Sequence, residues 1–162
     1  MTARTKGLVI AVLHVAIVCT LGVKLLYDRT VRPRVWVEVA PFDPDLPIRG
    51  RYVSLQMKPL ARGFTAPSDG FAWGNARLSV EDGHLIATRS DSPWGESVRI
   101  QNGDGTPAVV LWTPVAYFIP EHVADPSATP GLMVEVILPR KGPPRPIRLG
   151  IKDGDRISPL DM

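Results

Sequence analysis

The chain has 162 residues, of which 19 are Lys or Arg and 16 are Asp or Glu, so its formal charge is +3 at neutral pH. Six of the 19 basic residues but only one acidic residue precede residue 35, which leaves 13 basic and 15 acidic residues in the remainder. This distribution excludes a nucleic-acid-binding protein, because such a protein needs a basic surface interleaved with aromatic side chains. The 17 prolines and 14 glycines disfavour long helices in the remainder and are typical of turns between short strands.

Residues 7–27 form one apolar stretch that contains the only cysteine, Cys19, so no intramolecular disulfide can form. A helix of about 20 residues matches the hydrocarbon layer of a bilayer, which is about 30 Å thick. We therefore predict a transmembrane anchor at 7–27, preceded by a tail at 1–6 and followed by a basic juxtamembrane linker at 28–34. A cleaved signal sequence and a buried core helix are the alternatives, and the absence of an Ala-x-Ala-like pair at residues 20–28 disfavours cleavage.

The orientation of this span is predicted from its position near the N-terminus. Arg4 and Lys6 precede the span, and a larger basic group follows it: Lys24, Arg29, Arg32 and Arg34. This count alone favours the opposite orientation, with the C-terminal side in the cytoplasm. Basic residues beside a span meet anionic lipid head groups favourably, which makes the lipid bilayer a predicted partner. An anchor this close to the N-terminus usually leaves a short basic tail in the cytoplasm and exports the long domain behind it. We therefore expect residues 35–162 to form an extracytoplasmic domain.

Short β-type segments fill the exported part. Alternating or β-branched patterns predict strands at 35–39, 49–57, 77–80, 84–88, 97–100, 108–112, 115–119, 132–138 and 146–151. Asp82-Gly83 between two of these segments predicts a hairpin, whereas 59–75 has no periodicity and is predicted to be a loop. About eight short strands at even spacing favour a mainly β chain, with one N-terminal helix followed by an antiparallel β-sandwich or barrel-like domain.

Three segments resemble a family of bacterial membrane-anchored proteins, the GDYXXLXY family. They are the run from Asp43 to Leu55, the run from Tyr117 to Glu121, and the last predicted strand from Ile147 to Ile151. Arg51 stands where the motif has Asp, and Met57 stands where it has its last Tyr, so the name-giving carboxylate is absent. The resemblance implies a bacterial inner (plasma) membrane protein with its N-terminus in the cytoplasm and its domain in the periplasm, and it implies no activity.

The residues that match these motifs are the predicted binding or structural positions: Asp43, Pro44, Arg49, Gly50, Tyr52, Leu55, Tyr117, Phe118, Pro120 and Glu121. Arg49 and Glu121 are expected to pair and to lock one strand end to another, or to bind a ligand. The predicted function is that of an accessory or interaction module for a multi-span membrane partner, without catalytic residues.

Two other function classes remain open. An envelope hydrolase would use Glu121 and Asp45 as an acid–base pair facing each other at about 5 to 9.5 Å. A small-ligand or lipid-binding barrel would contain an apolar pocket of about 300 Å³ or more. Metal and cofactor sites are not expected, because His14, His84 and His122 share no ligand spacing.

Overall fold

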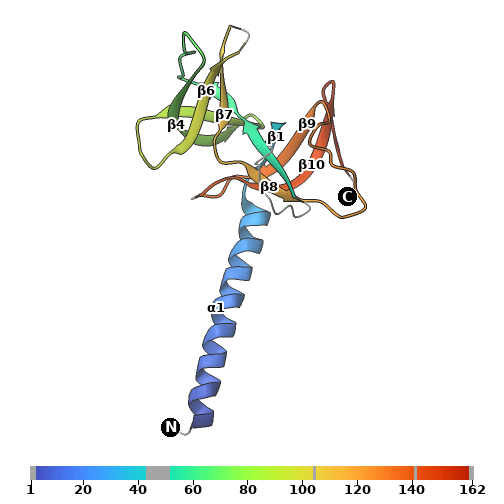
Figure 1. Ribbon diagram of the computed structural model, residues 1–162. Coiled ribbons are helices and arrows are strands. Elements are labelled where there is room, and N and C mark those ends of the chain that lie inside the picture. The colour runs from blue at the N-terminus through green and yellow to red at the C-terminus, as the bar shows by residue number, and fades with distance from the viewer. Residues whose placement is uncertain (1–2, 43–51, 104, 141, 161–162) are drawn as a thin grey trace. The chain divides into compact units, whose positions relative to one another are not determined.

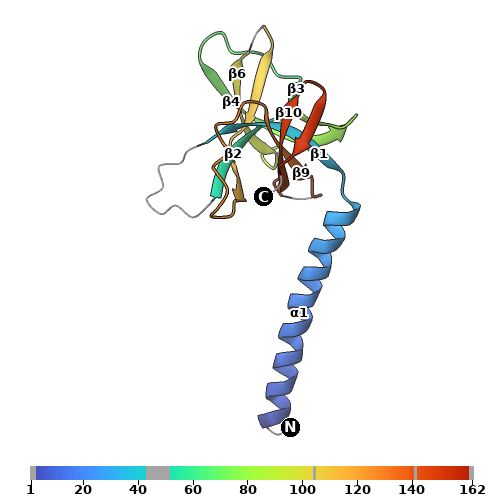
Figure 2. The same ribbon diagram turned by 90° about the vertical axis from the view of Figure 1, so that its right-hand side faces the viewer.

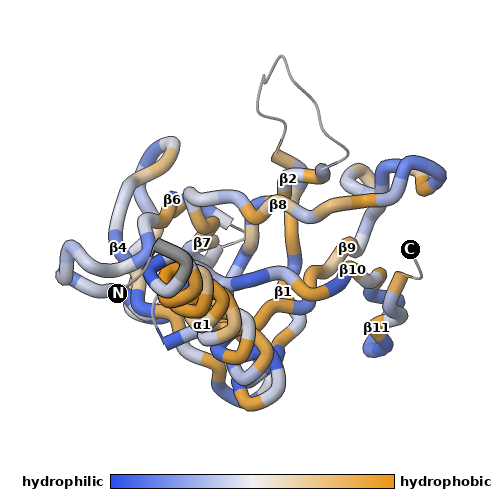
Figure 3. The backbone as a smooth tube through the Cα atoms, turned by 90° about the horizontal axis from the view of Figure 1, so that it is seen from below, coloured by the Kyte–Doolittle hydropathy of each residue, from blue (hydrophilic) through white to orange (hydrophobic). Residues whose placement is uncertain are grey.

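The computed structural model describes residues 3–42, 52–103, 105–140 and 142–160. These fall into two compact units, Met1–Arg32 and Pro33–Met162. The first unit is helix α1 (Ala3–Val31), and Figure 3 shows that hydrophobic residues occupy most of its length. Its Thr5–Val31 segment is 27 residues long, is not buried in the protein, and is apolar enough to cross a bilayer once. A signal sequence at this position has the same properties, so length and composition alone do not separate the two.

The helix continues past residue 27 into the predicted linker. The Arg32 backbone amide donates to the Asp28 carbonyl over 3.1 Å, and the two side chains form an ion pair at 3.3 Å. Pro33 ends the helix, because proline disfavours helical backbone in the residue before it. Only Arg32 and Pro33 separate the helix from the first strand, so the connection to the second unit is short.

The second unit consists of two curled sheets, seen from two sides in Figures 1 and 2. The six-stranded sheet is antiparallel and has the order β11-β10-β9-β1-β2-β8. Its strands are β1 (Arg34–Pro41), β2 (Tyr52–Lys58), β8 (Val115–Phe118), β9 (Leu132–Ile137), β10 (Arg145–Asp153) and β11 (Arg156–Pro159). This architecture confirms the prediction of a mainly β domain.

The five-stranded sheet has the order β3-β5-β4-β6-β7. Its strands are β3 (Leu60–Arg62), β4 (Phe71–Glu81), β5 (His84–Ser90), β6 (Glu96–Asn102) and β7 (Pro107–Leu111). All neighbours are antiparallel except β3 and β5, which are parallel. The Asp82-Gly83 hairpin is confirmed, since both residues have the positive φ values, 49° and 77°, that a tight hairpin turn requires.

One core joins the two sheets. Its fully buried members come from both of them and include Leu55, Met57, Val98, Val109, Val134, Val136 and Leu149. In β2, Val53, Leu55 and Met57 alternate into this core as predicted. Burial of these side chains is the main driving force that holds the two sheets together.

The predicted loop at 59–75 is wrong in part, because it contains β3 and the first residues of β4. Phe71 and Trp73 are exposed on the outer face, whereas the inward positions hold Ala72 and Gly74. A Cβ at Gly74 would lie 3.2 Å from Ile100, so a small residue fits here. The large aromatic side chains are outside and the small residues are inside, so the strand lacks the alternation of apolar and polar residues that marks a half-buried strand.

Strand β11 was not predicted either. It pairs with β10 through a hairpin in which Asp153 lies opposite Arg156, and Gly154 has a φ of 59°. Its short, largely exposed pattern lacks the apolar alternation that marks a half-buried strand.

Candidate functional site

The first two segments that resemble the GDYXXLXY family lie side by side in the six-stranded sheet. Strands β2 and β8 pair with Tyr52 opposite Phe118 and Val53 opposite Tyr117. The rings of Tyr52 and Phe118 pack edge to face with their centroids 5.4 Å apart, and both side chains are exposed. Leu55 is completely buried. The two segments therefore form a strand pair that contributes Leu55 to the core and one aromatic pair to the surface.

The third segment joins the same region. The Tyr117 hydroxyl donates to the Ile147 carbonyl over 3.4 Å, which connects β8 to β10 although three strands lie between them in the sheet order. The six-stranded sheet therefore curls until strands from its two sides approach each other. Tyr117 has a structural role at this closure.

Pro120 and Glu121 follow β8 in an exposed turn, where the Val123 amide donates to the Pro120 carbonyl over 3.2 Å. The predicted partners of Glu121 lie outside the described residues, as do Asp43, Pro44, Asp45, Arg49 and Gly50. The Arg49–Glu121 pair and the Glu121–Asp45 acid–base pair therefore stay predictions.

Three residues form a row across the outer face of the six-stranded sheet: Trp36 on β1, Glu135 on β9 and Arg148 on β10. The Arg148 guanidinium donates to the Glu135 carboxylate over 2.7 Å and lies 5.4 Å from the centre of the Trp36 ring. Only 8 % of the Glu135 side chain is exposed, so Arg148 compensates a carboxylate that has little access to water. A Cβ at Gly150 would lie 2.9 Å from the Trp36 ring, which makes glycine a packing requirement at this position.

The five-stranded sheet carries an exposed group of three aromatic residues, Phe71, Trp73 and Trp112, which we call the aromatic ledge. Their exposed fractions are 57 %, 53 % and 45 %. Trp73 packs edge to face on Phe71 and on Trp112, with centroid distances of 5.6 and 4.7 Å. These contacts fix three large apolar side chains at the surface, an arrangement that is typical of interaction sites rather than of ordinary surface.

Arg99 lies beside Trp73, a member of the aromatic ledge. It is opposite Trp73 on β4 and opposite Val110 on β7, so these three residues share the outer face of the sheet. Val110 is only 3 % exposed, although it is on the outer face, because its neighbours cover it. The Arg99 Nε is buried and has no hydrogen-bond partner among the described residues. Arginine and tryptophan are the side chains that most often dominate binding energy at protein interfaces.

Sequence analysis missed the aromatic ledge. Phe71 and Trp73 fell in the predicted loop, and Trp112 ended a predicted strand more than 35 residues further along the chain. Two aromatic residues at alternate positions, Phe71 and Trp73, were the available indication of a strand face. The register of β6 between β4 and β7 was needed to place Trp112 beside them.

A surface ion pair crosses the other end of the five-stranded sheet. Arg62 forms a two-pronged contact with Glu81 at 2.8 and 3.0 Å, and the Ser79 hydroxyl donates to the same carboxylate over 2.9 Å. The hydrogen bond from Arg62, followed by that from Ser79, lowers the pKa of Glu81, and the same pair raises the pKa of Arg62. Both groups are well exposed, so this pair is a surface feature and not a reactive site.

Within the described residues, no group of three or more His, Cys, Asp or Glu side chains is placed to hold a metal ion. Comparison with known proteins adds no assignment, since no family model, no curated protein and no solved structure matches the chain. The resemblance to the GDYXXLXY family therefore stays a prediction.

Proposed function

We propose that this chain is a membrane-anchored, extracytoplasmic interaction module without enzymatic activity, and that it binds an integral membrane protein. The observation that carries the proposal is the aromatic ledge on a domain that follows a membrane-length helix after two residues. A group of three exposed aromatic side chains on a soluble domain is costly unless a partner covers it.

The nature of the partner follows from the short connection. An anchored domain with a two-residue connection stays within reach of the bilayer, so its partner is in or on the same membrane. Trp73 and Trp112 provide rigid, amphipathic contact area, and Arg99 provides donors for a carboxylate or a carbonyl of the partner. The alternative of an envelope hydrolase rests on Glu121 and Asp45, and Asp45 lies outside the described residues.

A photo-crosslinking experiment tests the docking surface. A photoreactive phenylalanine analogue replaces Phe71 in the full-length protein in its native membrane, and crosslinked products are identified after detergent extraction. We expect one membrane protein to dominate, and we expect the double substitution Trp73→Ala and Trp112→Ala to abolish the product. Leu60→Ala is the matched control, because Leu60 is 54 % exposed on β3 of the same sheet but outside the aromatic ledge. A product that survives the double substitution contradicts the proposal.

The motif region supplies a second surface to compare. Charge reversal of Glu121 tests whether the exposed turn after β8 contributes to the same interaction, as the sequence predicts. We expect Glu121→Lys to weaken co-purification of the partner and to leave membrane insertion intact. Unchanged co-purification restricts the binding site to the aromatic ledge.

The membrane orientation of the domain is tested in a variant that lacks the native cysteine. In a Cys19→Ala background, Ser68→Cys places one thiol on the exposed connection between β3 and β4. A membrane-impermeant maleimide added to intact spheroplasts is expected to label this thiol, and labelling that requires lysis contradicts export. An N-terminal epitope that stays attached to the labelled domain identifies an anchor, whereas its loss identifies a cleaved signal sequence.

A further inference from the structure

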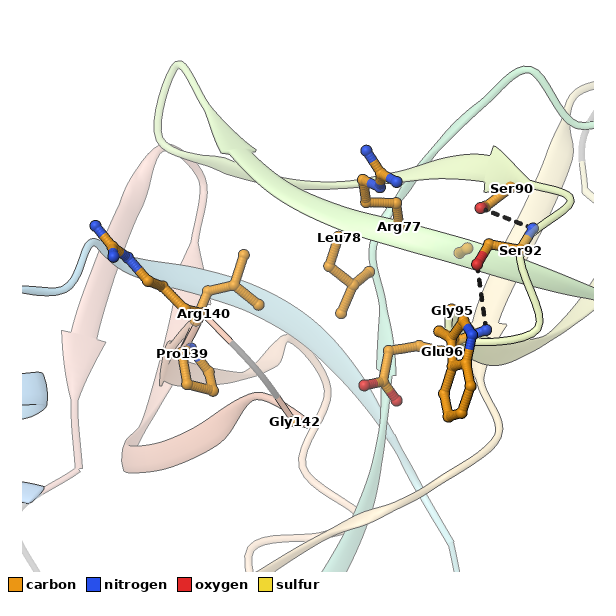
Figure 4. A pocket seen from close by; sticks show the side chains of 12 residues that line it. Arg77, Leu78, Ser90, Ser92, Gly95, Glu96, Pro139, Arg140 and Gly142 are labelled. Atoms are coloured by element: carbon orange, nitrogen blue, oxygen red, sulfur yellow. Dashed lines mark hydrogen bonds between the residues drawn. The ribbon is translucent and has the colours of Figure 1, made fainter.

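A cavity of about 790 Å³ opens between the two sheets, on the inner side of β4. It is bounded by β4, by the β5–β6 connection and by the chain that follows β9, and Figure 4 shows these walls. Its apolar surface comes from Leu78, Leu138, Pro139 and Trp94, and its hydroxyl groups come from Ser90 and Ser92. The volume is in the range of small-ligand sites, about 300 to 1,000 Å³.

Glu96 places a carboxylate inside this cavity. It begins β6 opposite Ala76, which is completely buried, so its side chain is on the inner face of the sheet. The side chain is half-buried and forms no hydrogen bond or ion pair with any described residue. Polar groups on the inner face of a sheet are normally paired, because an unpaired one loses hydration without compensation.

The negative and positive groups of the cavity wall point in different directions. Figure 4 shows the Glu96 carboxylate directed into the space between Leu78 and Pro139, whereas the guanidinium groups of Arg77 and Arg140 point away from it. Both arginines are exposed. Among the described residues that line the cavity, one carboxylate and an apolar wall face a ligand, while the guanidinium groups of Arg77 and Arg140 are in solvent.

The β5–β6 connection is held in a defined conformation. The Ser92 amide donates to the Ser90 hydroxyl over 3.2 Å, and the Trp94 amide donates to the Ser92 hydroxyl over 3.3 Å. The Gly95 amide donates to the Ser92 carbonyl over 3.2 Å, and a Cβ at Gly95 would lie 2.8 Å from the Ala76 carbonyl oxygen. These contacts fix the backbone of the connection beside the cavity, while the Trp94 side chain at its rim is 94 % exposed and free to contact a ligand.

We propose that this cavity binds a primary ammonium or guanidinium group carried on an apolar stem. The Glu96 carboxylate accepts charge-assisted hydrogen bonds from the cationic group, and the Trp94 indole offers the aromatic face that binds cations best. Leu78, Leu138 and Pro139 contact the stem, and the Ser90 and Ser92 hydroxyl groups accept further hydrogen bonds. The site does not depend on the aromatic ledge, which lies on the opposite face of β4.

Two sources can supply this chemistry, a lysine or arginine side chain of a protein and a free amine. The test uses full-length protein labelled with ¹⁵N-tryptophan in nanodiscs. The first probe is N-acetyl-lysine amide, and N-acetyl-norleucine amide is its neutral match. We expect the lysine derivative to shift the Trp94 indole peak saturably and to receive saturation transfer from the protein, and we expect the norleucine derivative to do neither.

The Glu96→Gln variant tests the charge partner. It is expected to weaken binding of the lysine derivative by about tenfold or more, because it removes a charge-assisted hydrogen bond. Glu38→Gln is the matched control, since Glu38 is exposed on β1 and pairs with Lys58 at 3.0 Å, and it should leave binding unchanged. Unshifted indole peaks of Trp36, Trp73 and Trp112 verify that Glu96→Gln is folded. Equal binding of the two derivatives, or full binding by Glu96→Gln, overturns the proposal.

A second variant tests the site at an exposed residue, whose substitution does not affect the core. Trp94 is almost fully exposed, so Trp94→Ala is expected to fold and to reduce saturation transfer to the lysine derivative several-fold. No reduction, or binding of butyrate in place of the amine, contradicts the proposal. Tighter binding of Ac-Leu-Lys-Leu-NH₂ than of cadaverine assigns the site to a basic side chain of a protein, and the reverse order assigns it to a free amine.

Discussion

The two sheets of the β-domain use their outer faces differently. On the six-stranded sheet, Trp36, Arg148 and Glu135 satisfy each other, and the exposed aromatic side chains are one pair, Tyr52 and Phe118, on β2 and β8. On the five-stranded sheet, the aromatic ledge is exposed and Arg99 has a buried Nε without a described partner. Paired groups on a surface stabilise the fold, whereas exposed aromatic side chains provide apolar area that a partner can cover.

This difference separates the residues that resemble a family motif from those that carry the proposed binding. Leu55 and Tyr117 are in the core or at the closure of the six-stranded sheet, and Arg148 and Gly150 belong to its outer row. A sequence motif can therefore mark a folding requirement while binding residues lie on another sheet. The next four experiments test this division.

The largest effect is expected from the core of the motif. Leu55→Ala removes a completely buried side chain and leaves a cavity, so we expect the free energy of unfolding to fall by about 2–5 kcal/mol. Trp73→Ala, on the aromatic ledge, is expected to cost less than about 1 kcal/mol. Urea unfolding of the detergent-solubilised full-length protein, followed by fluorescence, measures both. Equal destabilisation by the two substitutions would remove the distinction between the sheets.

A smaller loss is expected at the outer row. Arg148→Met leaves the Glu135 carboxylate with little hydration and no cationic partner, which should cost about 1–3 kcal/mol. Lys58→Met breaks a comparable ion pair with Glu38, but that carboxylate is 60 % exposed, so the cost should be below about 1 kcal/mol. The same urea titrations compare the two variants, and similar losses would show that burial of Glu135 has no energetic consequence.

The close packing of Gly150 on Trp36 can be tested with a second substitution that compensates for the first. Gly150→Ala forces a methyl group against the Trp36 ring and is expected to destabilise the domain by about 1–3 kcal/mol. Combining it with Trp36→Leu removes the ring and should recover part of this loss in thermal unfolding. An additive combination of the two substitutions would be inconsistent with the close contact.

The smallest effect concerns the surface pair on the five-stranded sheet. Because Arg62 and Ser79 lower the pKa of Glu81, a carboxyl ¹³C titration should give a midpoint below the usual glutamate value, and Arg62→Met should raise it. A lowered pKa in the folded state contributes stability above the unfolded pKa, and this contribution is lost as the pH falls through the folded pKa. A midpoint that Arg62→Met does not move would show that the ion pair is absent in solution.

Local patterns were sufficient where burial follows a simple period. The alternation in 132–138 and the Asp82-Gly83 turn predicted β9 and the β4–β5 hairpin, because strand periodicity and turn stereochemistry are properties of neighbouring residues. The same method failed at Phe71–Asn75, where large side chains are outside and small ones are inside. It also gave no account of Glu96, because the inner face of β6 is defined only by its pairing with β4.

The sequence alone determined that a membrane-length apolar helix precedes a mainly β domain, because hydropathy and alternation are encoded residue by residue. It also placed Tyr52 and Phe118 among the positions of interest. Only the tertiary structure decided that these two rings touch, that Trp112 joins Phe71 and Trp73, and that Glu96 enters a cavity. Those arrangements depend on strand order and register between distant segments, which no local pattern specifies.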